Sequence, residues 1–206
     1  EMCSYNQFVI EQKAAEKGEA FAEAAEFFKQ RLGEVEEVTE LAPDLTNPRQ
    51  QGENGRVWAP IAWNDAEQLA KQQGVKPSAV LLSAVFYSLS RFSGNDQVCI
   101  TTISIGRSNL KVANTMGMFV NTLALSSKIG SQSVCEFLHE SAETFEQTLA
   151  HENYPFARIA ADFGLKADIM FAYQMGVLSD YRVGGKKVLA DETMELNVPK
   201  FKIAFY

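Results

Sequence analysis

The chain has 206 residues, of which 46% are hydrophobic and 22% charged, a composition typical of a globular protein with its own core. Its 26 acidic side chains outnumber 19 basic ones, and no basic stretch is interleaved with aromatic residues, which argues against a nucleic-acid-binding protein. The three cysteines, at positions 3, 99 and 135, lack the spacing of a disulfide framework or a zinc site. No stretch is apolar over enough residues to cross a bilayer, and the first residues have no signal-peptide pattern. We therefore expect a cytoplasmic protein without a metal centre and without nucleic acid or membrane as a partner.

The first third of the sequence predicts helices followed by a loop. Apolar side chains recur at helical spacing up to Leu32, and Gly18 divides this region into two helices, because Gly weakens a helix interior by about 1 kcal/mol relative to Ala. Residues 33–55 are polar and contain several Pro and Gly, which indicates a loop with room for a short strand at Val35–Leu41. The chain begins inside an apparent helix and ends inside an apparent strand, so we expect a fragment of a longer protein.

Downstream, short runs of β-branched and apolar residues alternate with segments of helical periodicity. Strands are predicted at Arg56–Ala62, Gln97–Ile105, Met116–Leu125, Ala167–Tyr173, Val183–Leu189 and Phe201–Phe205. Helices are predicted at 64–73, Pro77–Arg91, 134–151 and Phe156–Phe163. Two of them are expected to begin with capping boxes, at Asn64–Glu67 and at Ser133–Glu136. The pair Gly184–Gly185 reads as a hairpin tip, and the alternation as a whole predicts an α/β fold, a mixed sheet with helices packed on it.

The segment Met116–Leu125 is mostly apolar but has Asn121 and Thr122 in its middle. A buried amide without hydrogen-bond partners costs about 1–3 kcal/mol, so the side chain of Asn121 needs partners. It either ties a loop to the strand or faces a polar cavity. From this stretch alone the first interpretation is favoured, because most buried polar groups are simply satisfied.

The residues on their own do not define a catalytic centre. His151 is expected at the end of a helix, where an imidazole interacts favourably with the helix dipole by about 0.3–1 kcal/mol. A role as general base would require a partner that the sequence does not identify. The single Gly in the loop Gly106–Asn109 is too little for a phosphate-binding loop.

Two segments of the chain have a distinctive order of residues. Residues 116–122 read Met-Gly-Met-Phe-Val-Asn-Thr, which resembles the (Ile/Val)-Gly-x-Phe-Val-Asn-Thr motif of the condensation domains of nonribosomal peptide synthetases. Residues 151–156 read His-Glu-Asn-Tyr-Pro-Phe and resemble that family's His-Gln-Asp-Tyr-Pro-Phe motif, at the expected distance downstream. Residues 90–98 and Gly106–Arg107 are similar to the helix, turn and strand that precede the first motif. Tyr5–Phe8 resembles, less closely, the Tyr-x-Asp-Phe motif, with Gln7 in place of Asp.

The chain also departs from that family. The catalytic motif His-His-x-x-x-Asp-Gly is absent, and in full domains it precedes the part that this chain resembles. The motif Arg-Asp-x-Ser-Arg-Asn-Pro-Leu, expected between Phe163 and Asp168, is missing as well, and Leu165–Ala167 occupies its place. We therefore expect residues 1–206 to be the C-terminal subdomain of a divergent condensation domain, one α/β lobe, with the N-terminal lobe absent.

The resemblance implies the second lobe of a chloramphenicol acetyltransferase-like fold, the fold of CoA-dependent acyltransferases, with the active site in a tunnel between the lobes. The full-length protein would join a carrier-bound acyl or peptidyl thioester to the amine of a carrier-bound amino acid. Phosphopantetheine would be carried by the partner carrier proteins, and no cofactor would be bound directly. Since the catalytic His lies on the missing lobe, this chain is expected to be inactive alone. Further implied partners are that lobe and the neighbouring synthetase domains, and the exposed face of the lobe could support a homodimer.

The resemblance also implies site residues. Positions next to the motifs are expected to form the tunnel wall: Ser104, Gly106, Arg107, Asn121, Thr122 and Gln174. Other motif positions are expected to have structural roles: Gly117, Phe119, His151, Tyr154, Pro155 and Phe156. The alternatives are an epimerisation domain or another acyltransferase of the same superfamily, or a non-catalytic module that docks carrier proteins. The Phe-Val-Asn-Thr motif favours condensation.

Overall fold

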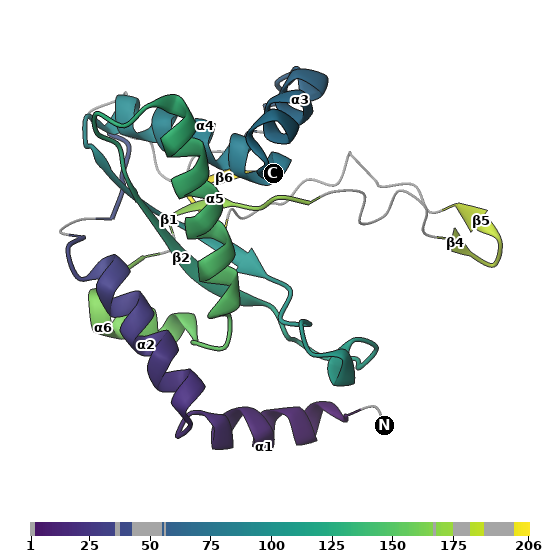
Figure 1. Cartoon of the computed structure of the whole chain (residues 1–206). Coiled ribbons are helices and arrows are strands. Elements are labelled where there is room, and N and C mark those ends of the chain that lie inside the picture. The colour runs from purple at the N-terminus through teal and green to yellow at the C-terminus, as the bar shows by residue number, and fades with distance from the viewer. Residues whose placement is uncertain are drawn as a thin grey trace.

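A mixed four-stranded sheet lies at the centre of the fold (Figure 1). The structure is a computed structural model, and it describes residues 3–35, 38–42, 55, 57–166, 168–174, 182–187 and 200–206. The strand order is β2–β1–β3–β6, with β1 at Gln97–Ser104, β2 at Asn121–Lys128, β3 at Ile169–Phe171 and β6 at Ile203–Phe205. β1 pairs antiparallel with β2 and parallel with β3, and β3 pairs parallel with β6. This arrangement confirms the predicted α/β fold with a mixed sheet.

The strand directions bring several chain segments to one edge of the sheet. Because β1, β3 and β6 are parallel, their carboxyl ends lie at the same edge, and the antiparallel β2 begins there. The register places Ser104, the last residue of β1, opposite Asn121, the first residue of β2. The loop after β1 and the segment before β2 therefore leave the sheet side by side.

The chain begins with two helices, α1 (Tyr5–Ala15) and α2 (Glu19–Leu32), which separate near Gly18 as predicted. Both lie at the purple beginning of the chain in Figure 1. The hydroxyl of Ser4 caps α1 by accepting a hydrogen bond from the amide of Gln7 at 3.2 Å. α1 fully buries none of its residues, whereas α2 buries Ala24, Phe28 and Leu32.

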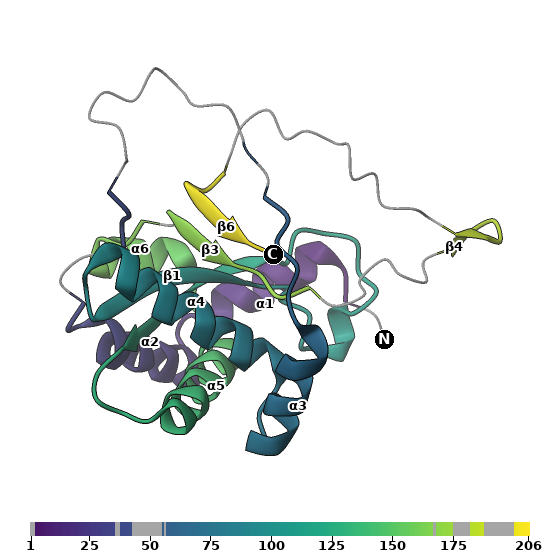
Figure 2. The same cartoon turned by 90° about the horizontal axis from the view of Figure 1, so that it is seen from above.

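In the part of the chain that the structure describes, four further helices follow: α3 (Trp63–Gln73), α4 (Pro77–Ser93), α5 (Val134–Ala150) and α6 (Phe156–Phe163). A short 3₁₀ turn spans Leu110–Val112, and a small hairpin is formed by β4 (Arg182–Val183) and β5 (Lys186–Lys187) around the predicted Gly pair. From above, α4 runs along β1 (Figure 2). The capping box at the start of α5 is confirmed, because the amide of Ser133 donates to Glu136 at 2.7 Å and the amide of Glu136 donates to Ser133 Oγ at 3.3 Å.

Two apolar clusters fix these helices on the sheet. The first joins α4 and α5 to the strands through Leu82, Phe86, Leu89, Val98, Ile100, Leu125, Ile129, Phe137, Ile169 and Phe171. The second joins α2 and α6 to the strands through Ala24, Phe28, Leu32, Cys99, Leu123, Ala124, Tyr154, Ile159 and Leu165. The first cluster thus holds the helices α4 and α5, and the second brings the N-terminal helix α2 against the segment that contains Tyr154.

Two predictions for the segment around the start of α3, a strand and a capping box, are wrong. The described residues of the predicted strand Arg56–Ala62, which are 57–62, are irregular, and Val57 and Ile61 are exposed, so the apolar run pairs with no neighbouring strand. The predicted capping box at Asn64 does not form. The helix α3 begins at Trp63, so its N-cap residue is Ala62, whose side chain has no oxygen that could accept a hydrogen bond from the first turn. The ring of Trp63, at the first position of this helix, stacks on Tyr173 with 6.5 Å between centroids.

Other predicted strands are shorter in the structure. Residues 38–41 form no strand, although Thr39 exchanges hydrogen bonds with Cys99 through its amide and its hydroxyl. The strand predicted at Met116–Leu125 begins only at Asn121, because the carbonyls of Gly117 and Met118 accept hydrogen bonds from the side chains of Arg107 and Tyr5. Of the strand predicted at Val183–Leu189, residues 183–187 form the hairpin, and 188–189 lie outside the described residues, as does most of the predicted loop 33–55.

In the described part of the chain, every helix is too short or too polar to reach across a bilayer.

Candidate functional site: the junction of the two motifs

The two motifs found in the sequence meet in space through the side chain of Asn121. Its amide nitrogen donates to the carbonyl oxygens of Glu152 and Tyr154, each at 2.9 Å. Its amide oxygen accepts from the backbone N–H of Phe156 at 3.4 Å. The amide therefore ties the first residue of β2 to the turn between α5 and α6, which is the loop-tying role favoured for it. We call this region the motif junction: the end of β1 with its loop (104–108), residues 116–121, and the turn 151–156.

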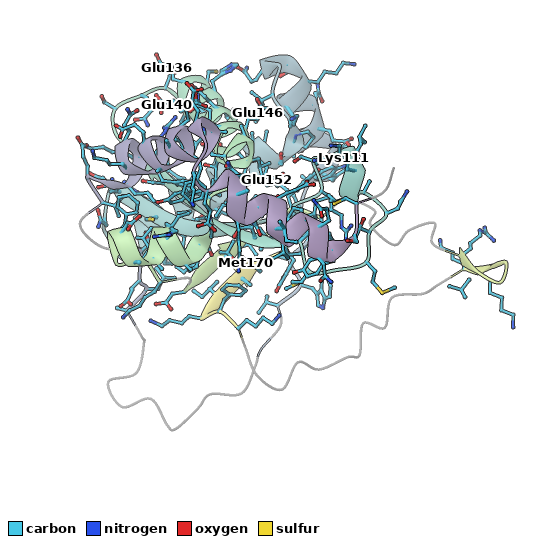
Figure 3. All side chains as sticks on the ribbon, turned by 90° about the horizontal axis from the view of Figure 1, so that it is seen from below. Lys111, Glu136, Glu140, Glu146, Glu152 and Met170 are labelled. Atoms are coloured by element: carbon cyan, nitrogen blue, oxygen red, sulfur yellow. The ribbon has the colours of Figure 1, made fainter. Side chains whose placement is uncertain are left out.

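A carboxylate closes the other side of the junction. The hydroxyls of Ser104 and Ser108 both donate to the carboxylate of Glu152, and the amide of Gly106 donates to Ser104 Oγ at 3.0 Å. Ser104 is buried and Glu152 is half-buried. In the view from below, Glu152 lies near the middle of the molecule, while Glu136 and Glu140 lie further out (Figure 3). The turn is thus held at two points, by its carbonyls through Asn121 and by this carboxylate.

Two glycines allow the segments of the junction to approach closely. Gly106 has a φ of +63°, and a Cβ at this position would lie 2.0 Å from the carbonyl oxygen of Phe119. A Cβ at Gly117 would lie 2.3 Å from the ring of Tyr5. Any larger residue would therefore push residues 117–119 away from the loop after β1 or from α1.

The guanidinium of Arg107 is surrounded by backbone. It donates to the carbonyls of Val112 at 2.7 Å, Ala113 at 3.3 Å, Thr115 at 2.8 Å and Gly117 at 3.3 Å. Its central carbon lies 4.3 Å from the centroid of the buried ring of Phe119. This predicted tunnel-wall residue therefore faces its own loop in the structure.

The N-terminal segment packs against the same loop. The amide of Cys3 donates to the carbonyl of Lys111 at 3.0 Å, and Thr115 Oγ1 donates to the carbonyl of Cys3 at 2.6 Å. The hydroxyl of Tyr5 donates to the carbonyl of Met118 at 3.0 Å. The rings of Tyr5 and Phe8 contact the ring of Phe119, with centroids 5.3 and 4.7 Å apart. Residues 5–8, which resemble a further motif, thus support the first motif directly.

The α5–α6 turn is covered by α2. The ring of His151 stacks on Phe27 at 4.2 Å with an interplanar angle of 6°, and its Nδ1 lies 2.8 Å from the carbonyl oxygen of Gln147. Tyr154 is buried, and its hydroxyl donates to Asp162 at 2.8 Å. His151 therefore closes the C-terminus of α5, in agreement with the structural interpretation of this residue.

The electrostatics of Tyr154 follow from this position. Burial raises the pKa of its phenol, and the neighbouring carboxylate of Asp162 raises it further, while the nearby Arg158 lowers it. The phenol stays protonated and acts as a hydrogen-bond donor. Pro155 precedes α6 as its N-cap residue, and Phe156 begins the helix with its side chain half-buried.

The other predicted tunnel residues lie beside the junction. Thr122 is half-buried in β2 opposite Ile103, and Gln174 is exposed after the end of β3, at the same sheet edge. The hydrogen bonds that tie the junction together come from other side chains, and the tunnel assignment stays a prediction for both residues. Neither Ser108 nor Glu152 was predicted as a site residue from the sequence. The one signal for Glu152 was that it stands at a motif position where the resembled family has Gln.

Several apolar side chains of the junction and of the loop beside it are exposed, among exposed polar residues such as Lys111 and Asn114. Leu110 is 88% exposed, Met116 94% and Met118 73%, and Ile105 and Val120 are also exposed. No group of His, Cys, Asp and Glu among the described residues could hold a metal ion. The one imidazole of the junction is occupied by the helix end and by Phe27.

Comparisons with known proteins agree with this architecture. A model of the family described as "Condensation domain" matches residues 1–195. The chain is 27% identical over 173 residues to gramicidin S synthase 2 of Brevibacillus brevis, covering 80% of this chain and 4% of that protein. It superposes on the four-domain nonribosomal peptide synthetase holo-AB3403 bound to AMP and glycine with a TM-score of 0.71 at 22% identity, covering 82% of this chain and 14% of the other.

A second solved structure gives a comparable match. The first condensation domain of the calcium-dependent antibiotic synthetase, in complex with a substrate analogue, superposes with a TM-score of 0.65 at 17% identity. The superposition covers 83% of this chain and 39% of that one, so the chain corresponds to a minor part of each of these proteins. The family model spans nearly the whole sequence, and the motif junction lies within it. The chain belongs to the condensation-domain family.

Proposed function

We propose that this chain is one lobe of a condensation domain that forms amide bonds in nonribosomal peptide synthesis. The amine nitrogen of a carrier-bound amino acid attacks the carbonyl of a carrier-bound acyl or peptidyl thioester. A C–N bond forms, the C–S bond breaks, and the donor carrier leaves as the free thiol with the proton that the amine loses. The chain contributes one wall of the space in which the two groups meet.

The observation that carries the proposal is the joining of the two motifs by Asn121 within a member of this family. Asn121 lies 31 to 35 residues from its partners in the chain, and its hydrogen bonds hold the Phe-Val-Asn-Thr segment and the His-to-Phe segment together at the sheet edge. In this proposal the two segments form one wall of the site. A wall of this kind contributes by holding reactants in place. Positioning two reactants can lower a barrier by about 7–11 kcal/mol in favourable cases.

The proposal includes the partners of the reaction. The donor and acceptor groups arrive on carrier proteins through phosphopantetheine arms, and a second lobe that carries the His-His-x-x-x-Asp-Gly motif supplies the proton acceptor. The site is cytoplasmic in this proposal. The free thiols of Cys3, Cys99 and Cys135 are compatible with a reducing compartment.

The experiment is an amide-forming assay on the complete protein that contains this chain. It is incubated with an acyl-loaded donor carrier and a panel of aminoacyl-loaded acceptor carriers, and the intact mass of each acceptor carrier is measured. A mass gain equal to the acyl group is expected for at least one amino acid. Inversion of the amino acid without acyl transfer would instead identify an epimerisation domain, and carrier binding without either reaction would identify a docking module.

The chain by itself serves as the matched control. Since the catalytic motif is absent from its sequence, residues 1–206 should bring about no amide formation under the same conditions. Turnover by these residues alone would contradict the placement of the proton acceptor on another lobe.

A further inference from the structure

The helix α1 is held to the rest of the fold through the residues at its beginning. In α1 and its connection to α2, every residue from Ile10 to Ala20 is exposed. Among residues 3–9, four side chains are half-buried: Cys3, Tyr5, Phe8 and Val9. An isolated helix of 11 residues is marginal in water, because its first turn fixes several residues for a single hydrogen bond. The helix therefore depends on the contacts of residues 3–9, which we call the N-terminal strap.

The strap binds a loop that lies more than 100 residues later in the chain, residues 110–119. The amide of Cys3 donates to the carbonyl of Lys111 at 3.0 Å, and the hydroxyl of Thr115 donates to the carbonyl of Cys3 at 2.6 Å. The hydroxyl of Tyr5 donates to the carbonyl of Met118 at 3.0 Å. Figures 1 and 2 both show the beginning of the chain beside this teal loop.

Phe119 provides the apolar part of this contact. The centroid of its buried ring lies 5.3 Å from that of Tyr5 and 4.7 Å from that of Phe8. The ring of Tyr5 also covers the backbone of Gly117, where a Cβ would lie 2.3 Å from it. Release of the strap would expose the ring of Phe119 and the backbone of Gly117. The strap and the loop thus stabilise each other.

Outside this contact, both segments have few buried side chains. Glu16, directly after α1, forms a surface ion pair with Arg158 at 3.8 Å, and such pairs contribute little to stability. In the loop Val112 is buried, but Ala113, Asn114 and Met116 are exposed. Segments with few buried contacts open locally, at a lower free energy than the core of the same protein.

We propose that residues 3–15 and the loop 110–119 form one locally unfolding unit, in which strap release and loop opening are a single step. In the closed state the strap holds Gly117 and Phe119 of the first motif in place. In the open state both lose this support, while the hydrogen bonds of Asn121 still tie β2 to the turn between α5 and α6. The N-terminal segment therefore controls the conformation of the first motif, and this inference does not depend on the proposed function.

The test is residue-resolved hydrogen exchange in the complete protein that contains this chain. Three sets of amides are compared: residues 8–15 of α1, then Val112, Ala113 and Thr115 of the loop, and the strand β1 as a core reference. In the unmodified protein the protection factors of the first two sets should agree within about threefold, and both should be at least about tenfold lower than those of β1.

One variant on each segment tests whether the two open together. Tyr5→Phe removes only the hydroxyl that reaches Met118, and it should speed the exchange of both sets about fivefold, the effect of one hydrogen bond. Thr115→Val keeps the shape of the side chain and removes its hydrogen bond to Cys3. It should speed the exchange of α1 by a similar factor, although α1 is about 100 residues away in the chain.

Tyr87→Phe is the matched control, because Tyr87 is exposed on α4 beside Arg91 and takes no part in the strap contact. It should leave both sets unchanged, and β1 should be unaffected in all three variants. Faster exchange of one segment with unchanged exchange of the other would overturn the proposal, since the segments would then open independently. Unchanged exchange of both segments in Tyr5→Phe and Thr115→Val, or an equal acceleration in β1, would overturn it as well.

Discussion

Asn121 and Arg107 both hold loops at the same sheet edge, but over different distances in the chain. Asn121 joins β2 to the turn between α5 and α6, more than 30 residues away in the chain. The two segments meet only because the sheet and these helices pack together. Arg107 binds carbonyls 5 to 10 residues away, within one loop. The comparison teaches that the first contact connects distant parts of the fold, while the second shapes one loop, in which Met116 and Met118 are exposed and Val112 is buried. Substitutions around Asn121 should therefore lower global stability, and those around Arg107 should act locally.

The largest effect is expected from Gly106→Ala, which forces the two segments of the junction apart. Its φ of +63° costs an L-residue about 1–2 kcal/mol, and the displaced carbonyl of Phe119 adds to this, for a total of about 3 kcal/mol. Urea denaturation measures the loss. Gly74→Ala is the matched control, because Gly74 has a similar φ of +67° with no atom within 4 Å, and it should lose only about 1–2 kcal/mol. Equal losses in the two variants would contradict the close approach at Gly106.

Asn121→Ala should follow, with a loss of about 2–3 kcal/mol. It leaves two carbonyls and one amide of the turn without their partner, and an unsatisfied buried group costs about 1–3 kcal/mol. Thermal and urea unfolding give the value. Asn153→Ala removes one exposed contact, to the carbonyl of Ala20 at 3.4 Å, and should change stability by less than about 0.5 kcal/mol.

Glu152→Ala should have an intermediate effect of about 1–2 kcal/mol, because it leaves the buried hydroxyl of Ser104 without its acceptor. Glu152→Gln keeps one acceptor oxygen and should recover more than half of that loss. The same unfolding experiment distinguishes the variants. If Gln and Ala at this position are equally destabilising, the charge and not the hydrogen-bond geometry is what Ser104 and Ser108 require.

The last effect is absent at neutral pH, is confined to alkaline pH and concerns the buried thiol of Cys99 in the core. Burial raises the pKa of the Cys99 thiol to about 12, whereas in the unfolded chain it is about 9.0. The unfolded chain therefore loses this proton first, and the contribution of the neutral thiol to stability, complete below pH 9, is lost between pH 9 and about 12. Above pH 9 the free energy of unfolding should decline less steeply in Cys99→Ala than in the unmodified chain. Parallel declines would show that the thiol titrates alike in both states.

Much of the fold could be predicted from the sequence, because its local signals agree with the tertiary structure. The helix Phe156–Phe163 has the predicted bounds, and the Ser133–Glu136 capping box forms. The strand expected from Met116 begins only at Asn121, because the carbonyls of Gly117 and Met118 accept hydrogen bonds from the side chains of Arg107 and Tyr5. The strand expected at 56–62 is not found at 57–62, because a run of apolar residues does not by itself supply a neighbouring strand.

The site was predicted less completely than the fold. The motif positions pointed to Ser104 and Asn121 as tunnel-wall residues, and that assignment stays a prediction for both. The side chain of Asn121 has the loop-tying role that its own stretch of sequence favoured before the motifs were considered. Its partners could not be read from the sequence, because they are backbone carbonyls brought within reach only by packing of α5, α6 and β2. Glu152 and Ser108 were missed for the same reason, since a carboxylate and a hydroxyl 44 residues apart give no local pattern.

The central claim is that the Asn121 contacts join distant parts of the fold, while the Arg107 contacts shape one loop. The most direct measurement combines the free energy of unfolding with hydrogen exchange of the amides of Val112, Ala113 and Thr115, in Asn121→Ala and in Arg107→Lys. We predict that Arg107→Lys speeds the exchange of these amides about tenfold and changes the free energy of unfolding by less than about 1 kcal/mol. Asn121→Ala should lower the free energy of unfolding by about 2–3 kcal/mol. A loss of global stability in Arg107→Lys as large as that in Asn121→Ala would contradict the account.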